Sequence, residues 1–330
     1  MTDELLATDP IGRFRADVLA GLSRPQKQIP AKYFYDAAGS RLFDAITELP
    51  EYYPTRTENG ILRAHAGELA RWCGPHCLLV ELGAGRLTKV RLLLDRLDSP
   101  AGYVPVDVCG DHLLAAAAGL ADDYPALHIT PVVVDFTTSF ALPGLPGVRR
   151  VAFFPGSTIG NFDPPEANVL LRRIADLVRP GGGLLLGVDL RKDPAVLERA
   201  YDDAAGVTAA FNRNLLTRIN RELGADFAPG AFRHVAVYNR DRSRVEMHLV
   251  SDAAQRVSVC GRAFRFRAGE SIHTENSYKY DVAELASRAA GCGWHLENCR
   301  TDERGYFAVL LLTVMDRSRH LNHTRQGVRL

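Results

Sequence analysis

The sequence has little of what would assign it to several special classes of protein. None of its 330 residues form an apolar run near the roughly 20 needed to cross a bilayer, and the first residues are too polar for a signal peptide. Lys and Arg (40) nearly balance Asp and Glu (39), which indicates no overall attraction to nucleic acid or an anionic membrane. We expect a cytoplasmic protein with neither partner.

Paired metal-binding motifs are also missing. The six cysteines are scattered without a Cys-x-x-Cys pair. Cys73, His76 and Cys77 lie close together in sequence, but no second pair with structural-zinc spacing follows them. Dispersed thiols of this kind are more typical of buried free cysteines, so we expect no bound metal.

A strand, a glycine turn and a helix are predicted between His76 and Leu97. An apolar run is followed by Glu81, by Gly83 and Gly85, and then by leucines at helical spacing. Such a turn lets backbone approach a ligand at the carboxyl end of a strand, which indicates a nucleotide-type cofactor site. Because the third glycine of a dinucleotide fingerprint is missing, a purely structural turn remains an alternative.

The next two predicted strands also end in polar residues. Asp107 follows the strand that begins at Tyr103, where its carboxylate can accept hydrogen bonds from ribose hydroxyls. Asp135 and Phe136 follow a strand predicted from residue 129 to 134, and they suit the amino group and the ring face of adenine. Three successive strand ends therefore carry groups that point toward one ligand.

Alternating strands and helices predict the fold class. The pattern indicates a doubly wound, mostly parallel α/β sheet with right-handed crossovers. Period-two runs between residues 232 and 273 predict an antiparallel insertion, after which a helix and two strands return to the sheet. We expect a core of residues 60–194 and 281–330, and a second lobe of residues 1–59 and 195–280.

Two further segments have both a structural and a functional interpretation. Gly156 to Asn161 follows an apolar strand and ends in an amide that can donate and accept, although an ordinary Gly/Asn turn explains it equally well. The aromatic segments from Tyr33 to Asp36 and from Glu51 to Arg56 are typical of a binding lid or of a packed N-terminal subdomain.

Longer motifs resemble those of the S-adenosylmethionine-dependent histidine Nα-methyltransferases of ergothioneine biosynthesis. The resemblance runs through nearly the whole chain. The motifs that carry it are Phe34-Tyr-Asp36 with Gly39-Ser40, Leu49-Pro-Glu-Tyr-Tyr-Pro-Thr-Arg56, Glu81-Leu-Gly-x-Gly85 with Lys89, Gly156-Ser-Thr-Ile-Gly-Asn161, Tyr201-Asp-Asp-Ala-x-Gly-Val-Thr-Ala-Ala-Phe-Asn212 and Thr274-Glu-x-Ser277.

The resemblance implies a seven-stranded class I methyltransferase (Rossmann-like) sheet with an inserted α+β substrate-binding lobe. It implies S-adenosyl-L-methionine as cofactor, held by Glu81, Gly83, Gly85, Lys89, Asp107, Asp135 and Phe136. It implies a substrate site formed by Tyr35, Tyr52, Tyr53, Gly156, Asn161, Tyr201, Met247, Glu275 and Ser277.

The implied reaction is transfer of up to three methyl groups to the α-amino group of L-histidine, which gives hercynine. Tyr35, Asn161 and Tyr201 are the implied catalytic residues. Methyl transfer from a sulfonium is an in-line displacement, so alignment is the enzyme's main task. Glu275 and Ser277 would hydrogen-bond the imidazole, and an analogue without the ring N–H would leave a buried carboxylate unpaired.

The sequence departs from the family pattern at Arg86 in the glycine loop, at Asn276 between Glu275 and Ser277, and at Tyr280, where phenylalanine is usual. A member of the same family that methylates another amino acid or amine is therefore an alternative, as is a non-catalytic S-adenosylmethionine-binding protein. A dinucleotide oxidoreductase is more distant, because the third glycine is missing. We expect a monomer whose partner is a small-molecule amino-acid substrate, with L-histidine favoured.

Overall fold

The computed structural model describes residues 9–142, 144 and 148–315. The chain divides into two compact units, each built from two separate segments. Unit 1 comprises Met1–Tyr53 and Lys192–Lys279, and unit 2 comprises Pro54–Arg191 and Tyr280–Leu330. The antiparallel insertion expected from the sequence lies in unit 1, together with the N-terminal segment.

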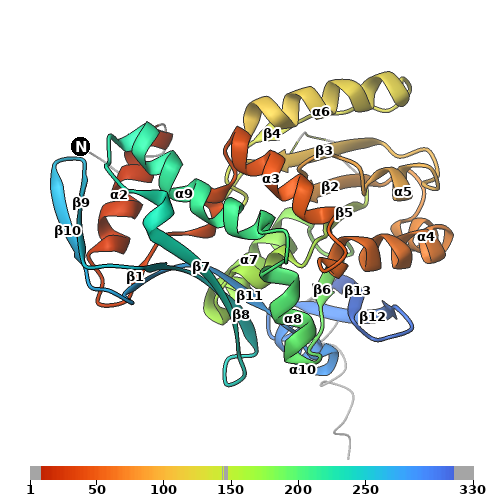
Figure 1. Cartoon of the computed structure of the whole chain (residues 1–330). Helices are drawn as coiled ribbons and strands as arrows, with labels where there is room; N and C mark the ends of the chain where they lie inside the picture. The colour runs from red at the N-terminus through yellow and green to blue at the C-terminus, as the bar shows by residue number, and fades with distance from the viewer. Residues whose placement is uncertain (1–8, 143, 145–147, 316–330) are drawn as a thin grey trace, which may run out of the picture. The chain divides into compact units, whose positions relative to one another are not determined.

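Unit 2 is built on a seven-stranded sheet with the order β12-β13-β6-β5-β2-β3-β4 (Figure 1). Strands β2 to β6 are parallel, whereas β13 pairs antiparallel with both β6 and β12. This is the doubly wound α/β sheet that the sequence predicted. The strands are β2 (Leu78–Leu82), β3 (Gly102–Asp107), β4 (Val132–Val133), β5 (Arg150–Phe154), β6 (Gly183–Asp189), β12 (Trp294–Thr301) and β13 (Phe307–Val314).

Helices bury both faces of this sheet. Alternate residues of β2 show the pattern, because Leu78, Val80 and Leu82 belong to one apolar cluster and Leu79 to the other. The first cluster includes side chains of α7 (Pro164–Val178) and α10 (Val282–Ala290). The second includes side chains of α4 (Tyr53–Cys73), α5 (Arg91–Leu94) and α6 (Gly110–Asp123). Burial on both sides explains why these strands are almost continuously apolar.

Two predicted elements of this unit are shorter than expected. The strand expected over residues 129–134 is reduced to the two residues of β4, and Ile129 forms only an isolated bridge with Tyr103. Pro131 lies between them and has no N–H to donate to a ladder, which explains the interruption. The helix expected after the glycine turn is only the single turn of α5.

Unit 1 contains a four-stranded sheet with the order β1-β11-β8-β7 and a separate β9-β10 hairpin. Its strands are β1 (Lys27–Gln28), β7 (Phe232–Asn239), β8 (Arg244–Ser251), β9 (Gln255–Val259), β10 (Arg262–Phe266) and β11 (Ser271–Tyr278). Its helices are α2 (Pro10–Leu22), η1 (Ala31–Phe34), α3 (Ala37–Thr47), α8 (Pro194–Tyr201), α9 (Val207–Leu223) and η3 (Pro229–Ala231). The segment from Thr274 to Ser277, expected to follow the last strand of the insertion, lies inside β11.

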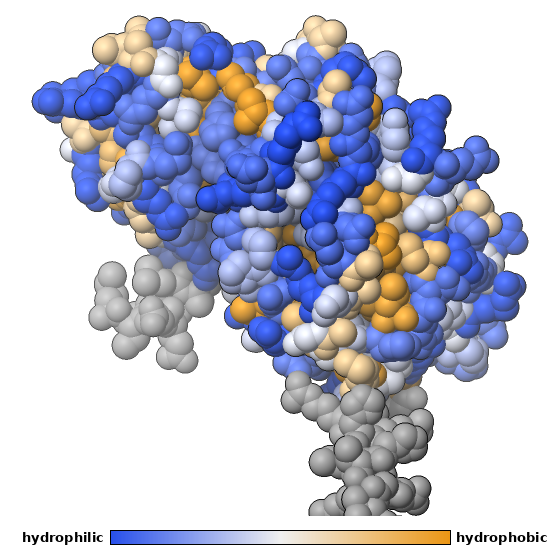
Figure 2. Space-filling model, turned by 90° about the horizontal axis from the view of Figure 1, so that it is seen from below, coloured by the Kyte–Doolittle hydropathy of each residue, from blue (hydrophilic) through white to orange (hydrophobic). Residues whose placement is uncertain are grey.

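Hydrophilic residues dominate the face shown in Figure 2, and its hydrophobic residues occur in separate groups. The large hydrophobic side chains that are exposed are scattered over several elements, as is usual for a folded domain. Within the described ranges, no helix combines the length and apolarity needed to cross a membrane.

Candidate active site

In unit 2, the glycine turn after β2 is held against the end of β3. The backbone N–H groups of Gly83 and Ala84 both donate to the Val106 carbonyl, at 2.9 and 3.1 Å. Gly85 N–H donates to a carboxylate oxygen of Asp107 at 3.1 Å. Both glycines have positive φ angles, +68° and +55°, which disfavour any other residue. Asp107 therefore shapes the turn, and its carboxylate retains lone pairs for a ligand hydroxyl.

Phe136 lies next to this turn. A Cβ atom added to Gly83 would lie 3.6 Å from the Phe136 ring, an ordinary van der Waals distance, so the ring packs directly beside the turn. The ring is fixed edge-on by Phe154 and Phe162, with centroids 5.6 and 6.3 Å away. Asp135 accepts a hydrogen bond from the Thr137 N–H at 3.0 Å. The structure thus brings the second and third predicted strand ends to the glycine turn.

The side chain of Glu81 is buried within β2 and is 2% exposed. It accepts a short hydrogen bond from the Tyr103 hydroxyl on β3. Desolvation raises the pKa of Glu81 to about 8, although this hydrogen bond and the Lys89 ammonium oppose the shift. Glu81 is thus a buried carboxyl beneath the glycine turn, and a contact with the cofactor stays a prediction.

Lys89 forms an ion pair with Glu58, a fully buried residue of α4. Both Glu58 oxygens also accept the backbone N–H of Gly156. Glu58 was not predicted from the sequence, because its partners are 31 and 98 residues away in the chain. The pair joins the turn after β2 to the loop after β5, which are two of the predicted ligand-binding segments.

The loop after β5 has an unusual backbone. Gly156 and Ser157 both have positive φ angles, +76° and +57°, and a left-handed serine is uncommon. The Ser157 hydroxyl accepts the backbone N–H of Asp189 at 2.9 Å, which ties the loop to the end of β6. Asn161 ends the short helix η2 (Thr158–Asn161) and is half-buried. Residues held in such conformations cluster at binding sites.

Unit 1 contains a small cavity lined mainly by aromatic and apolar side chains. Four of the expected substrate residues line it, and they come from the N-terminal segment, α8, β8 and β11. The lining residues are Phe43, Ile46, Tyr52, Ala200, Tyr201, Thr208, Phe211, Met247 and Glu275.

Two other expected tyrosines lie outside this lining. Tyr35 contacts two of the lining rings, Phe43 and Phe211, edge-on with centroids 5.6 and 5.8 Å away. The Tyr53 hydroxyl accepts a hydrogen bond from Lys192 at 2.7 Å, and the ammonium also lies 4.5 Å from the Tyr53 ring centroid. Tyr35 therefore supports the wall of the cavity, whereas Tyr53 is paired with a cation.

Three buried polar side chains form a hydrogen-bonded cluster beside the cavity. The hydroxyls of Tyr201 and Ser277 lie 2.6 Å apart. The Lys279 ammonium donates to both, at 3.0 and 2.8 Å, and Lys279 is 2% exposed. Lys279 was not predicted, because a lysine two residues after a serine carries no distinctive signal. Only the strand alternation that places 277 and 279 on one face could have pointed to it.

A β-bulge sets the direction of Glu275. On β11, His273 pairs with His248 but Glu275 pairs with Met247, so Thr274 is an extra residue in the ladder. A one-residue shift moves side chains to the opposite face of a sheet, and here it places Glu275 beside Met247 in the cavity wall. Desolvation raises the pKa of Glu275 to about 7, and the Lys279 charge opposes this.

The same strand register decides where Asn276 points, a position at which the sequence departs from the family pattern. This residue pairs with Glu246 and not with Met247. Alternation along β11 therefore directs it to the face opposite Glu275. Asn276 is thus not part of the cavity lining, although it lies between two residues expected to hold the substrate ring.

Comparison with solved structures agrees with the class of protein that this fold indicates. A crystal structure of an S-adenosylmethionine-dependent methyltransferase from Clostridium acetobutylicum superposes with a TM-score of 0.50 at 9% identity, covering 84% of this chain and 99% of that one. At this identity the likeness shows the fold alone. The protein has the class I S-adenosylmethionine-dependent methyltransferase fold.

Residues 14–314 match the family model described as histidine-specific methyltransferase, SAM-dependent. Histidine N-alpha-methyltransferase of Mycolicibacterium smegmatis is 44% identical over 317 residues, which are 94% of this chain and 98% of the relative. Its Mycobacterium tuberculosis counterpart is 46% identical over 303 residues, covering 90% and 94%. The chain belongs to the S-adenosylmethionine-dependent histidine-specific methyltransferase family. It is an enzyme whose cofactor is S-adenosylmethionine, and the resemblance seen in the sequence is confirmed.

A more distant relative is named for a different substrate. The 4-dimethylallyltryptophan N-methyltransferase of Penicillium roqueforti is 26% identical over 305 residues, covering 86% of this chain and 90% of the relative. The similar proteins therefore include an N-methyltransferase named for another amino acid.

Proposed function

We propose that this enzyme transfers methyl groups from S-adenosyl-L-methionine to the α-amino nitrogen of L-histidine, up to the trimethylated product hercynine. The observation that carries the proposal is the cavity of unit 1, where Glu275 lies within an otherwise largely aromatic and apolar lining. A carboxyl in such a place is costly unless a ligand supplies a hydrogen-bond donor. An imidazole N–H is such a donor, and its ring suits the aromatic wall.

The Tyr201, Ser277 and Lys279 cluster supports a second polar contact with the substrate. An ammonium group can only donate hydrogen bonds, so both hydroxyls accept from Lys279. The two hydroxyls also share a hydrogen bond across 2.6 Å. Hydroxyl groups suit the imidazole nitrogen that lacks a proton and the substrate carboxylate, because both are acceptors. We assign Ser277 to the ring and Tyr201 to the carboxylate.

The remaining substrate residues keep the roles that the family resemblance implies. Asn161 is proposed to contact the α-carboxylate with Tyr201, and Gly156 to line the same site. Tyr35 and Tyr52 or Tyr53 are proposed to lie near the ammonium group and the ring. The α-ammonium must lose a proton before its nitrogen attacks, and a tyrosine hydroxyl is one group that can relay it.

The cofactor is proposed to bind at the glycine turn of unit 2. Gly83 and Gly85 allow its methionine part to approach the backbone. Asp107 accepts from the ribose hydroxyls, while Asp135 and Phe136 contact the adenine. When bound, the cofactor supplies the electrophilic methyl group. The protein aligns the two reactants and excludes water.

Histidine is favoured over an aliphatic amino acid because only the histidine ring has an N–H that can donate a hydrogen bond to Glu275. The test is purified protein with S-adenosylmethionine and a panel of amino acids that includes histidine and tryptophan. Mass spectrometry then follows gains of one, two or three methyl groups. We expect methylation of histidine alone. Methylation of another amino acid in its place would refute the substrate and leave the reaction class intact.

We also propose ergothioneine biosynthesis as the pathway, a cytoplasmic location and a monomeric state. Ergothioneine biosynthesis protein 1 of Neurospora crassa is 30% identical over 275 residues, although these are 31% of that protein. The six cysteines are free, which fits a reducing compartment. Light scattering on the purified protein tests the monomer.

A further inference from the structure

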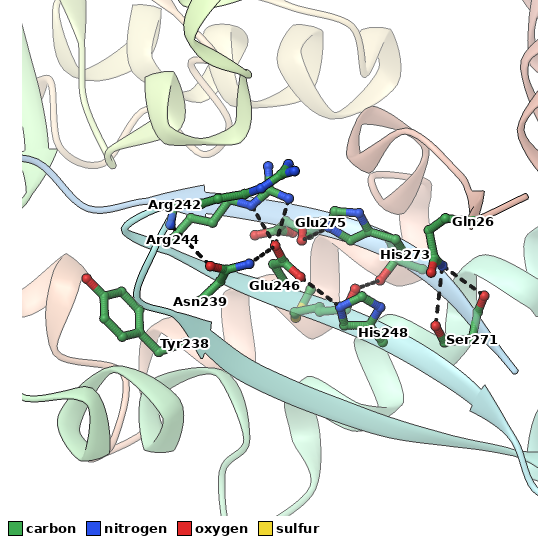
Figure 3. Close-up of polar contacts among 12 residues, drawn as sticks. Gln26, Tyr238, Asn239, Arg242, Arg244, Glu246, His248, Ser271, His273 and Glu275 are labelled. Carbon is green, nitrogen blue, oxygen red and sulfur yellow. Dashed lines mark hydrogen bonds and ion pairs between the residues drawn. The ribbon is translucent and has the colours of Figure 1, made fainter. Parts of the chain in front are cut away.

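Three potential metal ligands lie together on one face of the paired strands β8 and β11. Glu246 and His248 flank Met247 on β8, and His273 pairs with His248 across the ladder. One ligand atom from each of the three side chains lies within 4.8 Å of the others. Figure 3 shows the three side chains next to one another, with His273 also close to the Glu275 backbone.

We propose that Glu246, His248 and His273 form a binding site for a divalent transition metal of the Zn²⁺ class. A glutamate oxygen and a nitrogen of His248 are already 3.3 Å apart. Two ligand atoms that each lie about 2.1 Å from a tetrahedral zinc ion are separated by roughly 3.4 Å. Two imidazoles and one carboxylate are also a ligand set that suits zinc and its neighbours.

The surrounding hydrogen bonds orient these ligands. Oε1 of Glu246 accepts from Arg244 at 2.7 Å and from Asn239 at 3.0 Å, while Oε2 faces His248. Nε2 of His273 lies 3.0 Å from the Glu275 carbonyl, so a donated proton there leaves Nδ1 with its lone pair. Metal-binding histidines commonly donate their second N–H to a carbonyl in this way. Nε2 is the His248 atom that faces Glu246, whereas Nδ1 of the same ring is, among the described residues, buried without a hydrogen-bond partner, so no second hydrogen bond holds this ring in place.

Two features limit the strength of the site. The two imidazoles are stacked, with centroids 4.8 Å apart and an angle of 21° between their planes. Convergence of their lone pairs on one ion requires rotation of a ring about χ2, which is a soft torsion. The positive charge of Arg244 on Glu246 also opposes a cation. The site is therefore one for an exchangeable ion and not for a permanent structural one.

The test is calorimetric titration of the full-length, chelator-treated chain with ZnCl₂, and with CoCl₂ followed by its visible absorption. We expect one ion per chain. His248→Ala and His273→Ala should each weaken binding at least about tenfold, since loss of outer contacts alone costs that much. His273→Gln is a second variant that keeps a polar side chain at this position. Circular dichroism on each variant shows whether it is folded, so that weaker binding is not mistaken for a folding defect.

His295 lies on β12 of unit 2 and serves as a matched control. His295→Ala should bind zinc as the unmodified chain does. So should His320→Ala/His323→Ala, whose positions lie outside the described residues. The proposal is overturned if no ion binds, or if binding survives loss of His248 and His273. It is also overturned if the substitutions at 320 and 323 abolish binding.

Discussion

Both carboxylate oxygens of Glu58 accept the backbone N–H of Gly156, at 2.9 and 3.0 Å. Glu58 is fully buried in α4, and the Lys89 ammonium is its charge partner. One buried carboxylate therefore connects a helix, the segment after the glycine turn and the loop that follows β5. The geometry of the loop after β5 therefore depends on the ion pair between Glu58 and Lys89. Most of the proposed ligand-binding residues lie far from these two in the sequence.

Replacing Lys89 with methionine tests this connection. The change leaves Glu58 buried without its counterion, which typically costs about 3–5 kcal/mol of folding free energy. We expect that loss in urea unfolding, together with weaker binding of S-adenosylmethionine by calorimetry. Lys89→Arg is the control, because it keeps the positive charge and should lose less. Unchanged stability in Lys89→Met would show that the ion pair contributes nothing to the fold.

Thr274→Val tests the bulge that directs Glu275. The Thr274 hydroxyl donates to the Met247 carbonyl at 3.0 Å, and the residue is 2% exposed. Valine has nearly the same shape but leaves that carbonyl without this donor, at a cost of about 1–3 kcal/mol. We expect the KM for histidine to rise more than the Kd for S-adenosylmethionine. Thr313→Val on β13 is the control, and equal changes in both constants for Thr274→Val would contradict the assignment.

The sequence was enough to predict the sheet of unit 2, because strands buried on both faces read as apolar runs between helices. It also placed Gly83, Asp107 and Phe136 at neighbouring strand ends, and the structure brings these together. Glu58 could not be predicted, since its role comes from partners far along the chain. The direction of Asn276 was equally hidden, because a single inserted residue at Thr274 decides which face each later side chain takes.

Lys279→Met tests the polar cluster beside the cavity. Without the ammonium, the Tyr201 and Ser277 hydroxyls lose a shared donor and are free to point in other directions. Hydrogen bonds to charged groups contribute about 1.5–3 kcal/mol, so kcat/KM for histidine should fall by roughly 10- to 150-fold. Steady-state kinetics with histidine as the varied substrate measure this.

A matched control for Lys279 comes from the same unit. Lys27→Met removes an ion pair with Glu270, and neither residue of this pair lines the cavity. It should leave kcat/KM nearly unchanged. S-adenosylmethionine binding should also be kept in Lys279→Met, because Lys279 belongs to unit 1 and the glycine turn to unit 2. A parallel loss of cofactor binding would mean that Lys279 maintains the fold and does not position the substrate.

Glu275→Gln should make the free enzyme more stable at alkaline pH while impairing histidine use. The pKa of Glu275 is about 7 in the folded chain, above its ordinary value of 4.5. The folded state therefore retains a proton that the unfolded state releases, and stability falls as pH rises from about 4.5 to about 7. Glutamine removes this loss, which is at most about 3 kcal/mol at pH 8 and under about 1 kcal/mol at pH 5. Urea unfolding at both pH values measures the difference, with the exposed Glu303→Gln as control. A stability gain that is the same at pH 5 and pH 8 would contradict a raised pKa.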